Sequence, residues 1–515
     1  MRRAYSLLTI LFGCSAAFAQ PAPAIEWQRA LGGTLNDDGF SLEQTSDGGY
    51  IVAGQCFSNN GNVTGQHGGI DFWVVKLGSD GSLQWQKALG GAGYDNARCI
   101  HQTSDQGYIV AGGTESNDGD VSGNHGSDDC WVVKLDPSGS IQWQRCFGGS
   151  NQDAAAAILQ TLDDGYIIAG ETRSNDGDVS GNHGFDDVWV LRLDAGGSLI
   201  WQRTYGGSSD EFAHAMVEAG DGGYVIAGAS NSNDGQVTGN HGGGNDYWLL
   251  KVNGSGQLQW QKTCGGSGFD RAETVVRTSD GSFVAAGYCT SNDGDVTGAH
   301  GGVDCWVVCL DSSGTIQWQN SLGSSGNDSG ESIIAATNGD LVVAGVAGIN
   351  DGDVTATHGG GDAWVVRLSG TGTLRWEKSF GGTGGEDATD IVPTTDGGYA
   401  FTGSTSSNNG DVLGNHGGND YWVVKLLPDQ TSVGEVQAPP TFAIYPNPVS
   451  SELSITYPDT AHSLEVLNIL GQPILQTSFT RNAPLDVSAL APGTYTLRLF
   501  DARAVPVAVG RFVKE

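Results

Sequence analysis

Basic residues are scarce in this chain. Of its 515 residues, 24 are Lys or Arg and 58 are Asp or Glu, so the formal net charge at pH 7 is −34. A chain with this balance repels nucleic acid and anionic lipid, and it attracts cations or cationic polymers. We therefore exclude nucleic acid as a partner.

Stretches without glycine are also rare, because 82 glycines are spread along the chain. They interrupt every window longer than a few residues, and Trp, Tyr, Val and Ile crowd the intervals between them. Glycine disfavours helix interiors, whereas aromatic and β-branched residues favour strands. An all-β fold is predicted.

Long apolar runs are missing except near the N-terminus. Two arginines precede the apolar residues 7–12, and a small-residue cleavage pattern ends at Ala19. This pattern predicts a signal peptide over residues 1–19, and the alternative is a lipoprotein acylated at Cys14. No other run is long enough to give the mature chain a transmembrane segment.

Cysteine is sparse as well, with nine in the chain and eight after residue 19. Disulfides can persist in an exported protein. The one suggestive pair is Cys289 with Cys305, which stand at the end and the start of consecutive predicted strands. The sequence leaves the pairing of the other cysteines open.

The sequence is instead dominated by a repeat. A tryptophan-containing strand recurs every 58 residues, and once after 59, at Trp27, Trp85, Trp143, Trp201, Trp260, Trp318 and Trp376. Each unit has the pattern of four short strands, which in the second unit cover residues 97–103, 108–112, 129–135 and 140–147. Four strands per fixed period are typical of a propeller blade. The fourteen tryptophans, two per unit, are predicted to pack between blades.

The chain ends indicate how the ring closes. Segments like residues 71–77 occur seven times, and the last of them, residues 420–426, has no Trp-Gln strand after it. Residues 25–31 match the missing strand, and their pairing with residues 420–426 would remove an exposed sheet edge. We predict a seven-bladed β-propeller over residues 25–427, closed by the N-terminal strand.

The repeat stops after residue 427. A polar, proline-containing linker is predicted over residues 428–440, and residues 441–515 have the pattern of a separate small β module. Residues 20–440 hold 52 acidic and 17 basic side chains, a net charge of −35, whereas the module holds six and five, a net charge of −1. The module has no titratable cluster suited to chemistry.

The module carries a series of motifs in a fixed order, namely Tyr445-Pro446-Asn447-Pro448, Leu464-Glu465-Val466, Leu470-Gly471, Asp486-Val487-Ser488, Gly493-Thr494-Tyr495 and Phe512-Val513-Lys514-Glu515. In these it resembles the sorting domain of cargo of the type IX secretion system of Bacteroidetes-type bacteria. The resemblance implies a small immunoglobulin-like β-sandwich that the outer-membrane translocon recognises. The ring resembles glycine-rich propeller repeats of secreted proteins from the same bacteria, a resemblance that carries no assigned activity.

The long connection between the second and third strands of each unit concentrates carboxylates. Seven such connections should ring one mouth of the central channel. Closely spaced aspartates with asparagines and glycine-exposed carbonyls suit calcium, which takes six to eight oxygen ligands. The candidate ligands are Asp118, Asp120, Asp129, Asp176, Asp178, Asp187, Asp293, Asp295, Asp304, Asp351, Asp353 and Asp362.

Turn geometry is the alternative explanation of these loops, because Asn, Asp and Gly tolerate positive φ and aspartates cap backbone N–H groups. The first unit has Asn60 and Asn62 where others have acids, and the fourth has Gln236. One histidine per loop suggests a transition metal, but their spacing around the ring favours a structural role in the turn. The histidines are His67, His125, His183, His241, His300, His358 and His416.

An active site in a symmetric ring must be built from residues that break the repeat. The candidates lie in first strands near the channel: Arg98 with His101, Glu211 with His214, and Arg271 with Glu273. Ordinary sequence variation explains each of them more simply, and no nucleophile with its base is evident. We assign no catalytic residues.

Together these patterns predict a protein that is secreted or held on the outer cell surface after export through the periplasm. Residues 441–515 would engage the type IX translocon. The ring would have a non-catalytic binding or structural role through its acidic loops, with an extracellular protein or glycan as partner. The alternative is an extracellular polysaccharide lyase or glycosidase with its site at the channel mouth.

Overall fold

Every described regular element of the protein is a β-strand. The computed structural model describes residues 21–429, 443–456, 463–468, 472–478, 484–500 and 506–515. The predicted signal peptide and residues 430–440 of the predicted linker lie outside these ranges. The chain divides between Asp429 and Gln430 into two compact units, each considered by itself below. Within the described ranges, no helix could cross a membrane.

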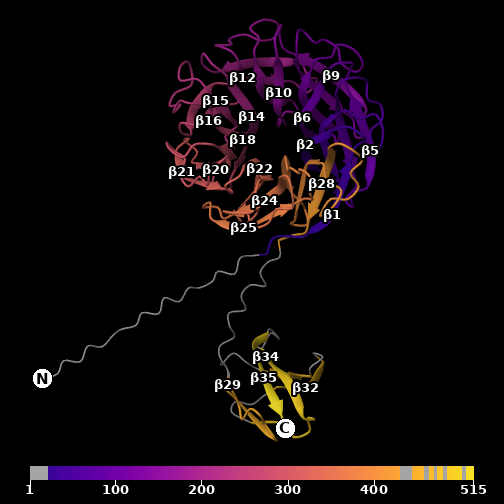
Figure 1. Cartoon of the computed structure of the whole chain (residues 1–515), viewed down its shortest axis with the longest axis vertical. Helices are drawn as coiled ribbons and strands as arrows, with labels where there is room; N and C mark the ends of the chain where they lie inside the picture. The colour runs from indigo at the N-terminus through magenta and orange to yellow at the C-terminus, as the bar shows by residue number, and fades with distance from the viewer. Residues whose placement is uncertain (1–20, 430–442, 457–462, 469–471, 479–483, 501–505) are drawn as a thin grey trace, which may run out of the picture. The chain divides into compact units, whose positions relative to one another are not determined.

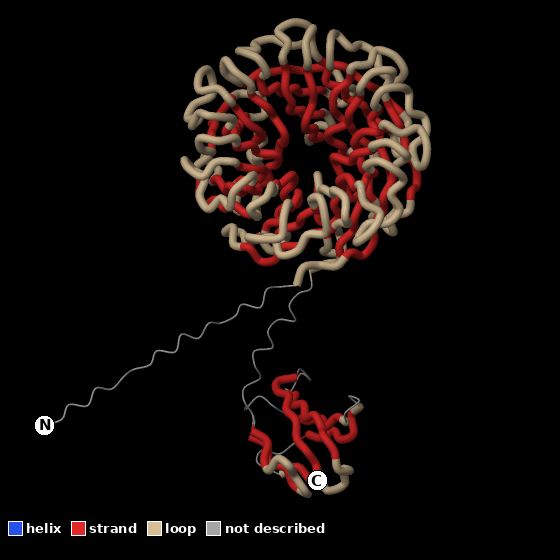
Figure 2. The backbone as a smooth tube through the Cα atoms, in the orientation of Figure 1, coloured by secondary structure: helices blue, strands red, loops and turns tan. Residues whose placement is uncertain are grey.

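The first unit holds seven four-stranded antiparallel sheets, which follow one another around a ring as the blades of a propeller do (Figures 1 and 2). Six of them each take four consecutive strands. These are β2 (Asp37–Gln44), β3 (Tyr50–Cys56), β4 (Asp71–Leu77) and β5 (Leu83–Leu89); β6 (Asp95–Gln102), β7 (Tyr108–Thr114), β8 (Asp129–Leu135) and β9 (Ile141–Phe147); β10 (Asp153–Gln160), β11 (Tyr166–Thr172), β12 (Asp187–Leu193) and β13 (Leu199–Tyr205); β14 (Glu211–Glu218), β15 (Tyr224–Ser230), β16 (Asp246–Val252) and β17 (Leu258–Cys264); β18 (Asp270–Arg277), β19 (Phe283–Cys289), β20 (Asp304–Leu310) and β21 (Ile316–Leu322); β22 (Ser329–Ala335), β23 (Leu341–Ala347), β24 (Asp362–Leu368) and β25 (Leu374–Phe380).

The remaining sheet joins the two ends of the ring. Its first three strands are β26 (Asp390–Pro393), β27 (Tyr399–Thr405) and β28 (Asp420–Leu426), and its fourth is β1 (Ile25–Leu31) from the N-terminal end. As the repeat predicts, β1 pairs antiparallel with β28, with Gln28 opposite Val424 and Leu31 opposite Tyr421. The Gln28 side chain also accepts a hydrogen bond from the Trp422 indole at 3.0 Å.

The core of this unit lies between neighbouring sheets and not at the centre of the ring. Each apolar cluster joins side chains of two consecutive sheets; one, for example, packs Ile51 and Val74 against Ile100 and Trp131. The third-strand tryptophans are buried, with exposed fractions of 0–1%. Their indole N–H groups donate to a fourth-strand side chain, as Trp131 does to Gln144 at 2.9 Å. The tryptophans therefore have the packing role that their spacing predicts.

Connections at the two ends of the ring differ in kind. Because consecutive strands are antiparallel, the second-to-third connections and the connections between sheets emerge at one end, which we call the loop face. Its long segments are residues 57–70, 115–128, 173–186, 231–245, 290–303, 348–361 and 406–419. Backbone bridges such as Ile70 with Tyr94 join a long segment to the following inter-sheet connection. Short third-to-fourth turns emerge at the opposite end.

The second unit is a smaller β structure. One sheet contains β32 (Pro473–Ser478), β31 (Ser463–Leu467), β34 (Gly493–Phe500) and β35 (Pro506–Lys514), in that order. The other contains β29 (Ala443–Tyr445), β30 (Glu452–Thr456) and β33 (Leu485–Asp486). Its apolar cluster includes Leu453, Val466, Leu497 and Phe512, so this unit has a core of its own.

Candidate functional site

In each long loop, the Asp or Asn just before a positive-φ glycine caps the neighbouring connection between sheets. Asp118 Oδ1 accepts a hydrogen bond from the Ala92 backbone N–H at 2.8 Å, and Asn60 Oδ1 does the same for Thr34 at 2.9 Å. The equivalent acceptors are Asp176, Asp234, Asp293, Asp351 and Asn409. The next residue is a glycine with φ between 58° and 66° in all seven loops. Capping of backbone N–H groups next to a positive-φ glycine is what the turn-geometry explanation of these loops predicts.

In four of the loops the second aspartate lies near the histidine of the preceding loop. His67 Nε2 lies 3.8 Å from Asp120 Oδ2, and His125 Nε2 lies 4.0 Å from Asp178 Oδ2. His241 and His300 stand in the same relation to Asp295 and Asp353, at 3.8 and 3.7 Å. Each of these carboxylates therefore contacts the preceding repeat. The sequence predicted instead that it would bind calcium together with other aspartates of its own repeat.

The third aspartate is buried at the start of the third strand. Asp129 Oδ2 accepts from the backbone N–H of His125 at 3.0 Å and lies 2.6 Å from its Nδ1. The same His–Asp contact recurs at His67, His183, His241, His358 and His416, at 2.6 to 3.0 Å, and at His300 Nδ1 lies 3.4 Å from Asp304 Oδ1. Burial raises the pKa of Asp129, and the His125 contacts oppose that rise. These contacts support the structural role in the turn that the spacing of the histidines favours.

The three predicted aspartates of one repeat have three separate tasks and do not converge on one point. In the described part of the chain, no group of three or more His, Cys, Asp or Glu side chains is placed to hold a metal ion. Calcium in the exposed part of the loops remains a prediction that these contacts do not test.

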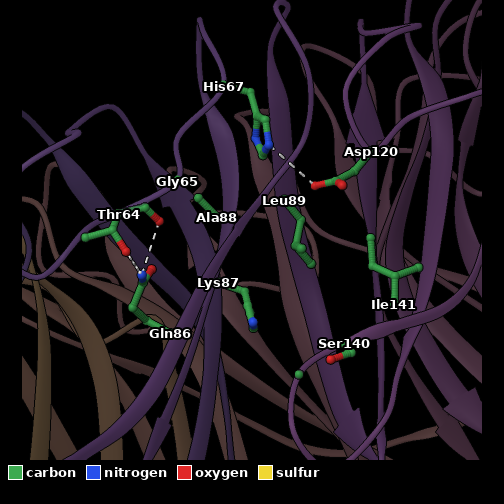
Figure 3. A pocket seen from close by; sticks show the side chains of 11 residues that line it. Thr64, Gly65, His67, Gln86, Lys87, Ala88, Leu89, Asp120, Ser140 and Ile141 are labelled. Carbon is green, nitrogen blue, oxygen red and sulfur yellow. Dashed lines mark hydrogen bonds and ion pairs between the residues drawn. The ribbon is translucent and has the colours of Figure 1, made fainter.

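A surface pocket lies between neighbouring repeats beside β5, and it extends from the long loops to the third-to-fourth turn at Ser140 (Figure 3). Its volume is about 480 Å³, and His67, Gln86, Lys87 and Asp120 are among the residues that line it. Gln86 donates to the Thr64 carbonyl at 3.1 Å, which ties β5 to the long loop. A similar pocket of about 350 Å³ lies one repeat earlier, beside Asn62 and His416. Related shallow pockets therefore lie along the fourth strands, next to the long loops.

An acid begins or precedes each first strand, and apart from Glu211 none of these acids was predicted as a site residue. Asp153, for example, is buried, and its Oδ2 accepts from the Gly149 N–H and the Ser174 hydroxyl, both at 2.7 Å. Each such acid faces the buried third-strand aspartate of the preceding repeat across a glycine. We call these the junction pairs: Asp420 with Asp37, Asp71 with Asp95, Asp129 with Asp153, Asp187 with Glu211, Asp246 with Asp270, Asp304 with Asp328, and Asp362 with Glu386. The acid that follows each Gly-rich connection at a fixed distance was the available sequence signal.

Two predictions about individual residues were wrong. Cys289 and Cys305 are free thiols; Cys289 pairs with Asp304 and Cys305 with Tyr288, so the two cysteines are not opposite each other in the hairpin. Glu211 does not face the channel, because its carboxylate is buried and accepts from the Gly207 N–H at 2.6 Å.

The first strands of the sheets line the centre of the ring (Figure 1). Several of their polar side chains line a cavity there. Arg98, His214, Arg271 and Glu273 line a cavity of about 560 Å³ there. Arg271 Nε lies 2.8 Å from Glu273 Oε1, and the Arg98 guanidinium lies over the Phe40 ring. His101 Nδ1 is 3.0 Å from Glu43 Oε2. Four of the six residues that break the repeat therefore do meet, although the sequence paired Glu211 with His214 incorrectly.

The channel acids predict how stability depends on pH. Burial raises the pKa of Glu171 to about 6 and that of Glu273 to about 7. A carboxyl pKa above its unfolded value means that the folded state holds the proton more tightly, so this contribution to stability is present near pH 4 and lost as pH rises through about 6 to 7. We expect the unfolding temperature to fall between pH 5 and pH 8, and Glu171→Gln to reduce that fall by about 1–3 °C. An unchanged pH profile in the variant would contradict this assignment.

Comparison with known families identifies the second unit. Residues 443–513 match the family described as the secretion system C-terminal sorting domain. The chain therefore carries a type IX sorting domain, which directs it to the cell surface or the medium, as the C-terminal motifs predict.

Similarities over the rest of the chain are distant. Regulatory protein FlaEY of Caulobacter vibrioides is 26% identical over 203 residues, which are 35% of this chain and 20% of that protein. The chain thus spans about a fifth of this curated relative. Among solved structures, PorZ, an essential surface component of the type IX secretion system of Porphyromonas gingivalis, shows 11% identity and a TM-score of 0.41, covering 96% of this chain and 61% of PorZ. The Neurospora crassa Pan2 WD40 domain shows 13% identity and a TM-score of 0.37, covering 65% of this chain and 90% of that domain.

Proposed function

We propose that residues 25–427 form a seven-bladed β-propeller with a non-catalytic binding role outside the cell, delivered there by a C-terminal immunoglobulin-like sorting module. The sorting-domain match supports the route of delivery. Seven four-stranded sheets with a closing N-terminal strand support the blade count. The two small sheets of the second unit, packed around one core, support the sandwich.

The observation that carries the binding role is the near-equivalence of the seven loops. The same capping hydrogen bond and the same glycine conformation recur in each of them. A set of similar shallow sites suits avidity toward a repetitive partner, whereas an enzyme needs one site that differs from the rest. The partner would be cationic, because the exposed carboxylates of Asp176, Asp293 and Asp351 are ionised: hydrogen bonds from backbone N–H groups hold each pKa below its usual value.

The chain offers a matched pair of charge-removing variants to test this role. The loop-face variant replaces Asp118, Asp176, Asp293 and Asp351 by Asn, which Asn60 and Asn409 show can make the same cap. The control variant replaces Asp80, Asp136, Asp194 and Asp311 by Asn. These residues cap the turns at the opposite end, and Asn253 already fills the position equivalent to Asp136, Asp194 and Asp311. Each variant removes four negative charges.

Binding to an immobilised polylysine surface would be measured for the wild type and both variants at several salt concentrations. We expect the loop-face variant to bind several-fold more weakly and the control variant to bind nearly as well as the wild type, because only the first loses charge from the contacting face. If both variants bind polylysine equally weakly, binding depends only on net charge, and the loop face has no special role in it. Turnover of a polysaccharide by the wild type would instead favour an extracellular enzyme with its site in the channel.

A further inference from the structure

Each junction between sheets contains a buried carboxylate oxygen that accepts no hydrogen bond, although in one of them His300 Nδ1 lies 3.4 Å from Asp304 Oδ1. Among the described residues, Asp129 Oδ1 makes no hydrogen bond, and the same is true of Oδ1 in the first member of all seven junction pairs. These side chains have exposed fractions of 0–1%. A buried acceptor without a partner costs stability, so one such atom would need an explanation. The same atom repeated seven times indicates that the position has a role.

The unpartnered oxygen points toward a second carboxylate. A β-carbon placed on Gly148 would lie 2.7 Å from Asp129 Oδ1 and 2.7 Å from Asp153 Oδ2, so both oxygens face the space that this glycine leaves. The other six junctions repeat the arrangement, with corresponding distances of 2.4 to 3.0 Å. Two anions side by side without solvent repel each other strongly unless a positive charge compensates them. The histidine of the turn does not satisfy the unpartnered oxygen, because His125, for example, contacts Oδ2 of Asp129 and not Oδ1.

A further side-chain oxygen lies over the same glycine in several junctions. The Gly148 N–H faces Asp178 Oδ2 at 3.4 Å, and the Gly323 N–H faces Asp353 Oδ2 at 3.3 Å. In the fourth repeat the corresponding oxygen is the amide of Gln236, 3.0 Å from the Gly206 N–H. In these three junctions an oxygen of the next long loop thus accepts from the N–H of the glycine between the paired carboxylates. Carboxylate and amide oxygens are ligands of hard cations.

The chemistry of the ligand follows from the charge to be balanced. A water molecule would satisfy the unpartnered oxygen and leave two negative charges. A proton on one carboxyl would remove one of those charges. A divalent cation would balance both and would use the unpartnered oxygen as a ligand.

We propose that the junction pairs are cation sites, each holding a calcium-type divalent ion between the third strand of one sheet and the first strand of the next. These sites are distinct from the exposed loop carboxylates of the proposed function. They reuse Asp129, Asp187, Asp304 and Asp362 from the sequence-based calcium prediction and take their second ligand from the following repeat. Calcium then joins neighbouring sheets, and the stability of the ring depends on it.

The test counts calcium in the full chain. The protein is stripped with a chelator, equilibrated with calcium chloride and analysed by atomic emission, and thermal unfolding is recorded with and without calcium. We expect up to seven equivalents and a higher unfolding temperature in calcium. In Asp129→Asn the amide carbonyl can still accept from His125 while the amide NH₂ faces Asp153, so the fold should be kept and one equivalent lost.

Replacing the first member of all seven junction pairs by Asn should abolish both calcium binding and the effect of calcium on unfolding. If that variant fails to fold, the loss of one equivalent of calcium in Asp129→Asn is the test of the proposal. The loop-face variant described above is the control and should keep every equivalent, whatever its binding to polylysine. The proposal is overturned by a wild type that binds no calcium, or by calcium lost in the loop-face variant and kept in Asp129→Asn. Stability that responds to pH and not to calcium would assign the site to a shared proton.

Discussion

A chain ending at residue 429 is expected to remain associated with the cell instead of reaching the outer surface or the medium. Residues 443–513 are the part that matches a secretion sorting domain, and they belong to a unit that is compact apart from the ring. The ring keeps its own sheets and core, so the truncated protein should fold and be lost only from the exported fraction. In a bacterium with a type IX system, we expect at least a ~10-fold drop in exported protein by immunoblotting of cell and medium fractions.

A reciprocal fusion tests whether the sorting domain is sufficient to export an unrelated protein. A fluorescent protein with a signal peptide and residues 430–515 appended should appear outside the cell. Phe512→Ala in the same fusion should reduce export, because Phe512 is fully buried in the core of this unit and its truncation costs about 3–5 kcal/mol. Export of the truncated chain at the wild-type level would show that the signal lies elsewhere.

Opening the ring should have the largest effect on stability. Deletion of residues 21–31 removes β1, which exposes the hydrogen-bonding edge of β28 and leaves the Trp422 indole without its acceptor. Leu31 and Ala30 also leave the core. We expect a loss of at least ~5 kcal/mol and association through the exposed edge, because an unpaired edge strand is a template for other chains. Thermal unfolding and size-exclusion chromatography measure the two effects.

Gln28→Ala is the matched control for this deletion. It keeps the backbone pairing of β1 with β28 and removes only the acceptor of the Trp422 N–H, so we expect a cost of about 1 kcal/mol and a monomeric protein. A deletion variant as stable and as monomeric as Gln28→Ala would mean that the ring does not depend on closure by β1.

Much of the architecture could be predicted because the sequence repeats with a period of 58 residues, and each repeat has the same pattern of strands. The interval between tryptophans located the strands of the second repeat, and the observed β6, β7, β8 and β9 differ from the prediction by at most two residues at an end. The boundary of β6 moved to Asp95 because that residue pairs with Thr114, a partner that the alternation of apolar residues does not reveal. The closing role of residues 25–31 could be predicted because the last repeat has no fourth strand of its own, and residues 25–31 match the fourth strands of the other repeats.

The candidate site was predicted less completely, and the reason is the range of the contacts. His125 and Asp129 are four residues apart, so their turn could be inferred from local sequence. Asp129 meets Asp153 only because one sheet packs against the next, and His125 reaches Asp178 for the same reason. The channel cavity brings Arg98 and Arg271 together from strands far apart in the chain.

The sequence by itself determined the all-β class, the number and order of the strands in the ring and the sorting domain, since each depends on short-range patterns of residue type. Only the tertiary structure decided which carboxylates share a site. Loop aspartates that look like one ligand set are divided among a cap, a contact with a neighbouring histidine and a buried junction, because packing between sheets fixes distances that spacing within a repeat does not contain. Because the junction carboxylates are buried, their mutual repulsion is not screened by water, whereas the exposed aspartates in the same loops are solvated.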